Sequence, residues 1–137
     1  MGSKLENILI LGIGGVGMHL ARRLVHEGAS VTVIETDPKL VQEAAETMDA
    51  RVLKGNSMSL SSWRAAEAES MELMIAATND DATNMLSALI ADRFGIERKI
   101  VRVRSLDFEP GSVLPPEELK LALMVHPEEL LALEIYR

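Results

Sequence analysis

The feature that most constrains the fold is a glycine-rich turn between an apolar run and an amphipathic one, in NILILGIGGVGMHLARRL (residues 7–24). Gly12, Gly14 and Gly17 have the G-x-G-x-x-G spacing. Glycines at this spacing permit a tight turn, close approach of the backbone to a pyrophosphate, and close packing of helix on strand. The motif therefore predicts a strand–turn–helix unit whose helix N-terminus attracts phosphate.

The rest of the chain alternates short apolar runs with helical stretches, which predicts right-handed βαβ crossovers and a parallel sheet. The expected strands cover residues 8–11, 30–35, 51–54, 73–77, 99–104 and 121–125. The expected helices cover residues 16–27, 38–47, 60–68, 82–94 and 127–136. This order predicts an α/β, Rossmann-like, doubly wound parallel six-stranded sheet in the order 3-2-1-4-5-6, with helices on both faces.

Composition limits the classes of protein that fit. The 137 residues suit one domain, and we expect a single domain over residues 1–137 with a flexible or tag-derived start at residues 1–6. Aromatic residues make up 3% of the chain, so the core should be aliphatic. A net charge of −7 argues against a nucleic-acid binder. The absence of cysteine and of long apolar runs suits a soluble, cytoplasmic protein.

A carboxylate follows the glycine motif at the distance that dinucleotide-binding folds require. Glu35 ends the second predicted strand, and an acidic residue there accepts hydrogen bonds from the adenosine ribose hydroxyls. Asp37 lies on the same side of the strand end, and two carboxylates would repel a 2′-phosphate, which disfavours NADP. Asp37 also fits the N-cap of a helix that starts at Pro38, and one residue can serve both purposes.

Other residues have plain structural explanations. His19 and His26 share one polar face of the first predicted helix, which indicates solvated surface rather than catalysis. Gly28 and Gly95 follow two helix ends, where a residue with positive φ is expected.

Several ordered motifs resemble those of the TrkA N-terminal (KTN or RCK) family, the regulatory nucleotide-binding domains of potassium transport proteins. The resemblance covers almost the whole chain. The motifs that carry it are ILGIGGVG, VTVIETDPKLV, ARVLKGNS, LMIAATNDDATNMLSALIA, IVRVRSLDF and VHPEELLALEIYR. The resemblance implies that the glycine turn holds a diphosphate and that Glu35 holds the adenosine ribose.

The resemblance also implies an adenine contact after the third strand, where family members commonly have an acidic residue. This chain has Asn56 there, followed by Ser57. Asparagine keeps an acceptor oxygen, adds donors and removes a charge, so an adenine contact at Asn56 stays open.

Two further positions lie near the expected crevice. Thr78 and Asp80 follow the fourth strand at the topological switch point of the sheet, but Thr78 with Asp81 also fits a helix capping box. Arg102 and Arg104 alternate on one face of the fifth strand, and the resemblance implies that an arginine here lies near the nucleotide phosphates or an interdomain contact.

The candidate cofactor-binding residues all lie in or directly after predicted strands. They are Gly12, Ile13, Gly14, Gly15, Val16, Gly17, Glu35, Thr36, Asp37, Gly55, Asn56, Ser57, Ala77, Thr78, Asn79, Asp80 and Arg102. No catalytic or metal-ligating residue is predicted, because no convincing general base, nucleophile or metal cluster stands out.

The function implied by the resemblance is regulatory. The domain would bind NAD or NADH, or alternatively ADP or ATP, and gate a membrane potassium transporter or channel through a change of conformation. The implied partners are a second copy of the chain, in a dimer or a larger ring, and an integral membrane potassium transporter. Through that transporter the cytoplasmic domain would lie peripherally at the inner face of the cell membrane. A fragment of an NAD-dependent dehydrogenase remains the alternative from another class.

Overall fold

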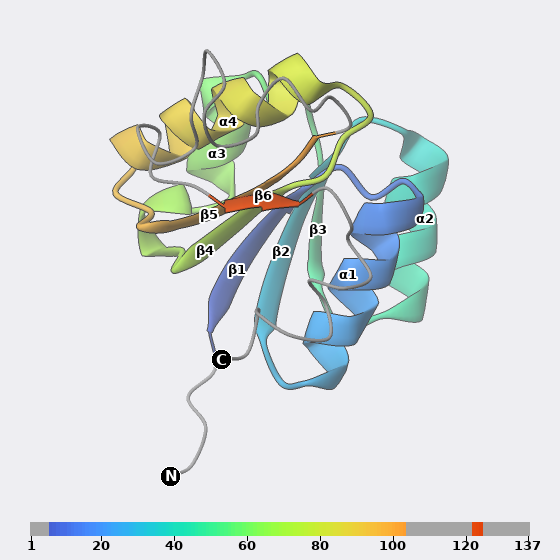
Figure 1. The fold of residues 1–137 in the computed structure, drawn as a ribbon. Helices are drawn as coiled ribbons and strands as arrows, with labels where there is room; N and C mark the ends of the chain where they lie inside the picture. The colour runs from blue at the N-terminus through green and yellow to red at the C-terminus, as the bar shows by residue number, and fades with distance from the viewer. Residues whose placement is uncertain (1–5, 104–121, 125–137) are drawn as a thin grey trace, which may run out of the picture.

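A computed structural model of the chain describes residues 6–103 and 122–124. Its strands form one six-stranded sheet in the order β3-β2-β1-β4-β5-β6, and every pairing in it is parallel (Figure 1). The strands are β1 (Asn7–Leu11), β2 (Ser30–Glu35), β3 (Arg51–Lys54), β4 (Leu73–Ala76), β5 (Arg98–Arg102) and β6 (Ala122–Met124).

The order 3-2-1-4-5 predicted for the first five strands is confirmed. β6 lies beside β5, with Ala122 opposite Ile100. The expected bounds of β2 and β3 agree with the structure, whereas β5 begins and ends earlier than expected. Arg104 and the helix expected over residues 127–136 lie outside the described residues.

Helices cover both faces of the sheet, with α1 and α2 on one face and α3 and α4 on the other (Figure 1). Their bounds are α1 (Gly15–His26), α2 (Pro38–Thr47), α3 (Leu60–Ala65) and α4 (Asp81–Arg93), with a short 3₁₀ helix η1 (Ala68–Ser70) after α3. The prediction of a single helix over residues 60–68 was wrong, because Glu67 has a left-handed backbone with φ 57° and separates α3 from η1. α4 begins one residue before its expected start, after the N-cap Asp80.

Two apolar layers hold the sheet between its helices. Along β1, Ile8 and Ile10 pack toward α1 and α2, and Leu9 and Leu11 pack toward α3 and α4. This alternation follows from the period of two along a strand, with both faces buried in a parallel sheet. The core is mostly aliphatic, but the expectation that it would lack aromatic residues was wrong at Trp63, which is fully buried.

Trp63 stacks on Phe94 with ring centroids 5.7 Å apart and an interplanar angle of 8°. Gly28 and Gly95 follow α1 and α4 with φ of 99° and 83°, which confirms the predicted helix ends. His19 and His26 are exposed, as predicted for the polar face of α1.

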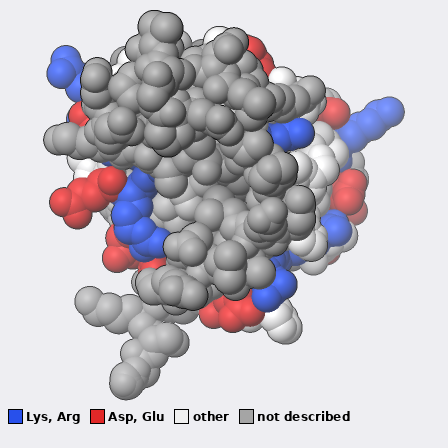
Figure 2. All heavy atoms as spheres, viewed as in Figure 1, with Lys and Arg blue, Asp and Glu red and all other residues white. Residues whose placement is uncertain are grey.

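The surface of the described part of the chain mixes charges of both signs. On the face drawn in Figure 2, the visible Lys and Arg side chains alternate with Asp and Glu around the margin and form no single-sign stripe. Within the described residues, none of the helices has the length and apolar character needed to cross a membrane.

Candidate functional site

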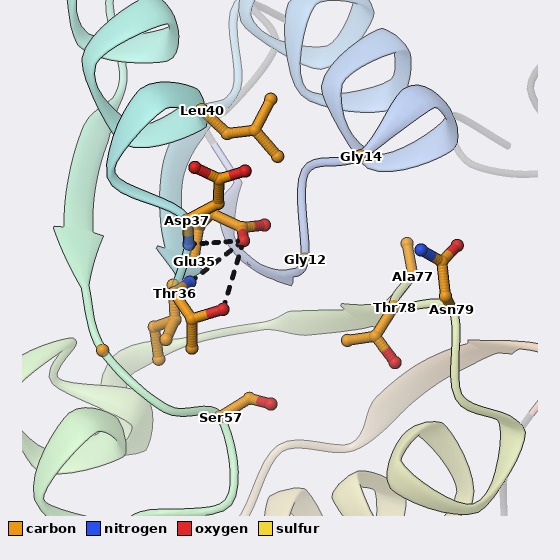
Figure 3. A pocket seen from close by; sticks show the side chains of 12 residues that line it. Gly12, Gly14, Glu35, Thr36, Asp37, Leu40, Ser57, Ala77, Thr78 and Asn79 are labelled. Atoms are coloured by element: carbon orange, nitrogen blue, oxygen red, sulfur yellow. Dashed lines mark hydrogen bonds between the residues drawn. The ribbon is translucent and has the colours of Figure 1, made fainter.

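The candidate site is a pocket of about 310 Å³ at the carboxyl ends of the central strands (Figure 3). Its walls come from the loops that follow β1, β2, β3 and β4, and from the first turn of α2. The lining residues are Gly12, Gly14, Ile34, Glu35, Thr36, Asp37, Leu40, Gly55, Ser57, Ala77, Thr78 and Asn79. Open α/β sheets bind ligands at this edge, where the strand order reverses between β1 and β4.

The glycine turn has the geometry that its sequence predicts. Gly12 has φ +86°, and its N–H donates to the carbonyl of Ile34 at 3.0 Å. A Cβ on Gly17 would lie 1.8 Å from the carbonyl oxygen of Gly12, so only glycine lets α1 pack this closely on the turn. Gly14 faces open space, since a Cβ there would meet nothing within 4 Å.

The N-terminus of α1 opens toward this pocket without a side-chain cap. Gly14 is the N-cap, no side chain bonds to the first turn, and that turn contains no acidic residue. α2 and α4 are different, because Asp37 and Asp80 cap their first turns. The first N–H groups of a helix need external acceptors, and the helix dipole favours an anion there. The end of α1 is therefore free to hold a phosphate group.

Glu35 links the end of β2 to the glycine turn. Its Oε1 accepts from the Ile13 N–H at 2.7 Å. Its Oε2 accepts from the N–H groups of Thr36 and Asp37 at 3.0 and 2.9 Å and from the Thr36 hydroxyl at 3.5 Å (Figure 3). These bonds fix the carboxylate at the pocket wall. Among the described residues, Oε1 accepts only the bond from Ile13, and an oxygen of a carboxylate can accept two, so Oε1 keeps one position for a ligand hydroxyl group.

Asp37 combines the two roles considered for it, as a cap and as a wall of the pocket. Its Oδ1 accepts from the Lys39 N–H at 2.9 Å, which confirms the capping interpretation, and Pro38 occupies the first helical position. Asp37 also lines the pocket beside Glu35. The two carboxylates make this end of the pocket unfavourable for an additional phosphate.

The loop after β3 presents Ser57, not Asn56, to the pocket. The Oδ1 of Asn56 accepts from the Met58 N–H at 2.7 Å, so this side chain stabilises its own turn. The Ser57 carbonyl accepts from the indole N–H of buried Trp63 at 2.7 Å, which fixes the loop. Adenine contact at Asn56 stays a prediction.

The loop after β4 forms the opposite rim. The interpretation of Thr78 and Asp81 as a capping box was wrong. Asp80 is the N-cap of α4, and its carboxylate accepts from the Ala82 N–H at 3.3 Å. The Thr83 hydroxyl donates to Asp80 at 2.6 Å and, together with backbone N–H groups, holds the pKa of Asp80 below its ordinary value. Asp80 itself does not line the pocket.

Thr78 is held instead by Asn84, a fully buried residue that was not among the predicted site residues. The Oδ1 of Asn84 accepts from the backbone N–H and the hydroxyl of Thr78 at 3.1 and 2.7 Å. A polar side chain four residues before Ala88 and seven before Ala91, both on the buried face of α4, is the signal that could have identified it.

Arg102 lies behind this rim. Its Nη1 donates to the Asn79 Oδ1 at 3.3 Å, and its side chain does not line the pocket. Ile13 and Gly15 line an adjoining hollow of about 270 Å³ between α1 and α2. The predicted residues that are not in the pocket wall are Ile13, Gly15, Val16, Gly17, Asn56, Asp80 and Arg102, and the residues that sequence reasoning missed are Ile34 and Leu40.

The pocket combines hydrogen-bonding groups with a helix end. Within residues 6–103 and 122–124, no group of three His, Asp or Glu side chains could hold a metal ion.

The strand order, the glycine turn, the uncapped helix end and the acidic end of β2 together define a Rossmann-like fold of the dinucleotide-binding class. Comparison with known families identifies the branch of that class. A model of the TrkA-N domain matches residues 8–111, and the chain belongs to this family.

Curated relatives agree with this assignment. The chain is 34% identical over 102 residues to a Trk system potassium uptake protein TrkA homolog from Methanothermobacter thermautotrophicus, covering 74% of this chain and 47% of the relative. It is 32% identical over 133 residues to TrkA of Haemophilus influenzae, covering 95% of this chain and 29% of the relative. The chain thus spans less than half the length of these relatives.

Solved structures share the fold. The TrkA-N domain of the inner membrane protein ybaL from Escherichia coli has a TM-score of 0.74 at 21% identity, covering 94% of this chain and 93% of that one. A GsuK channel bound to NAD has a TM-score of 0.67 at 19% identity, covering 88% of this chain and 21% of that one. A putative NAD-dependent epimerase/dehydratase from Bacillus halodurans has a TM-score of 0.61 at 17% identity, covering 74% of this chain and 53% of that one.

Proposed function

We propose that this domain binds a nicotinamide adenine dinucleotide, NAD or NADH, as the regulatory signal of a potassium uptake system. The observation that carries the proposal is the uncapped N-terminus of α1, which faces the pocket beside the carboxylate of Glu35. A diphosphate at the helix end and a ribose at Glu35 match the donors and acceptors that these two places offer.

The choice of ligand follows from the charges at the pocket wall. Glu35 and Asp37 disfavour the 2′-phosphate of NADP, because a third negative group would lie beside two carboxylates. ADP and ATP share the adenosine and diphosphate parts of NAD, so they are the alternative ligands. The GsuK channel that shares this fold was solved with NAD.

The names of the relatives and the residues that line the pocket both favour a regulatory function over a catalytic one. The curated relatives are Trk potassium uptake proteins, and the described residues that line the pocket include no His, Lys or Cys side chain. A dehydrogenase fragment is the second candidate, because the same fold carries epimerase-like enzymes. NAD-linked turnover by the chain with any candidate substrate would favour that candidate.

In this proposal the domain works at the inner face of the cell membrane. It pairs with a second copy, and its ligand-dependent conformation controls an integral membrane potassium transporter. A ligand can control that partner only if it binds one conformation of the domain better than another.

Calorimetric titration with NADH, NAD, ADP, ATP and NADPH tests the proposal. NADH or NAD should bind more tightly than millimolar, and NADPH should bind at least about tenfold more weakly than NADH. If none of the five nucleotides binds more tightly than millimolar, the proposed function is wrong.

A further inference from the structure

The buried amide of Asn84 ties the rim of the pocket to two other elements. Its Oδ1 accepts from the N–H and the hydroxyl of Thr78, as described above, and its Nδ2 donates to two carbonyl oxygens. These belong to Thr78, at 3.1 Å, and to Arg102 at the end of β5, at 2.8 Å. One side chain of α4 therefore fixes both the loop after β4 and the end of β5.

This arrangement uses all the hydrogen-bonding capacity that an asparagine side chain offers in a buried place. Asn84 is 0% exposed, and an amide has two donor hydrogens and one oxygen that accepts twice. Neither a carboxylate nor an apolar side chain can repeat the pattern. A carboxylate would put a second oxygen against the carbonyls of Thr78 and Arg102.

The rim that Asn84 fixes is packed directly against the glycine turn. A Cβ on Gly12 would lie 2.9 Å from the Cγ2 of Thr78 and 3.0 Å from its Cα. The rim also holds the side chain of Arg102, whose guanidinium donates to Asn79. A displacement of Thr78 would therefore change the width of the pocket on its β4 side.

The β4 side is where the second half of a dinucleotide has to lie. With the ribose at Glu35 on β2 and the diphosphate at the end of α1, the chain of ligand atoms continues past β1 toward β4. Thr78 and Asn79 face Glu35 across the pocket in this direction (Figure 3). A nucleoside diphosphate would end with its last phosphate at the glycine turn, so it would leave the part of the rim beyond the turn unoccupied.

We propose that Asn84 is a positioning residue that shapes the pocket for the second nucleotide of a dinucleotide, by holding Thr78 and Asn79 in place. This inference rests on the proposed function and names the part of the ligand that the rim serves. Asn84 does not touch the ligand, and acts through Thr78.

The test is to compare NADH and ADP binding in wild type, Asn84→Asp and Ser87→Ala. Ser87 is the matched control, because it is also fully buried on α4 but its hydroxyl donates to Thr83 of the same helix at 2.7 Å. Asn84→Asp should weaken NADH binding about tenfold or more and change ADP binding less than about threefold. Ser87→Ala should leave both affinities unchanged.

A folded Asn84→Asp protein that binds NADH like wild type would overturn the inference. An equal loss of NADH and ADP affinity would overturn it too, because that result indicates a general structural role. Wild type that binds neither nucleotide would instead contradict the proposed function. Wild type that binds ADP but not NADH would contradict both, since no second nucleotide would then reach the rim.

A measurement on wild type covers the case in which Asn84→Asp does not fold. In protein labelled with ¹⁵N-asparagine, the side-chain amide signals of Asn84 should shift on saturation with NADH and stay in place with ADP. Signals that stay in place with both ligands, while NADH binding is demonstrated by calorimetry, would overturn the inference.

Discussion

Glu35 connects the pocket to the glycine turn and to the loop between β2 and α2. Its carboxylate holds the N–H of Ile13 in the glycine turn and the N–H groups of the β2–α2 loop, so it orders the site before a ligand arrives. In the proposed function, the same carboxylate accepts a hydrogen bond from a ribose hydroxyl. Loss of this side chain should therefore affect binding more than it affects the rest of the fold.

Glu35→Ala should weaken NADH binding by about 1–3 kcal/mol, because buried donors of the turn and the ligand are left unpaired. Calorimetric titration measures the loss, with His26→Ala as a control on the exposed face of α1. Unchanged affinity in Glu35→Ala would remove Glu35 from the site.

The lowered pKa of Asp80, at the rim of the pocket, predicts that the stability of the folded protein depends on pH. The Thr83 hydroxyl and nearby backbone N–H groups lower its pKa in the folded state, so the unfolded state binds more protons in the acid range. The resulting stabilisation is present above the ordinary pKa of about 3.8 and is lost as the pH falls through the lowered value.

Urea unfolding of wild type and Asp80→Asn at several pH values tests this. The advantage of wild type should be largest at neutral pH and should shrink as the solution becomes more acidic than pH 3.8. A difference that stays constant down to the acid limit of folding would show that the Asp80 charge does not contribute.

Among the elements, the strand–turn–helix unit was predictable because Gly12 and Gly17 each have a distinct steric task. Gly12 needs positive φ, and Gly17 needs the absence of a Cβ. The bounds of β2, β3 and α2 agree with their patterns because caps and polar residues mark their ends. The loops after β1, β2 and β4 were expected to form the candidate site, because they follow the carboxyl ends of predicted parallel strands.

The bonding partners of the other site residues depend on packing that a linear pattern does not encode. Leu40 reaches the pocket from the first turn of α2, and Asn84 acts through four bonds that exist only when α4, β4 and β5 meet. The break between α3 and η1 depends on the left-handed backbone of Glu67, a conformation rare for residues other than glycine. Glu67 also pairs with Arg51 at 2.8 Å, a contact between distant parts of the chain.

The closeness of α1 to the turn predicts opposite effects for two glycines in one helix. Gly17→Ala would place a methyl group 1.8 Å from the Gly12 carbonyl, so it should lower the free energy of unfolding by several kcal/mol or prevent folding. Gly15→Ala meets nothing within 4 Å and should be neutral or stabilise by about 0.5–1 kcal/mol. Denaturant unfolding measures both. A Gly17→Ala protein as stable as wild type would contradict the packing described for the turn.

At the scale of the whole molecule, the two apolar layers hold the sheet rigidly while the loops at one edge carry the site. Ligand atoms that span from β2 to β4 would contact loops on both sides of the topological switch point. Binding across this point is the means by which a dinucleotide could join the two halves of the domain. A domain that reports nucleotide state needs such a link between ligand and conformation.

In the proposed function, the uncapped end of α1 holds the diphosphate of a nicotinamide adenine dinucleotide. Titration of ¹⁵N-labelled protein with NADH, followed by ¹H–¹⁵N NMR, tests it most directly. The backbone amides of Gly14, Gly15 and Val16 should shift most, together with those of Thr36 and Asp37 beside Glu35. Saturating NADH that leaves these amides in place, or that shifts only signals elsewhere in the chain, would contradict it.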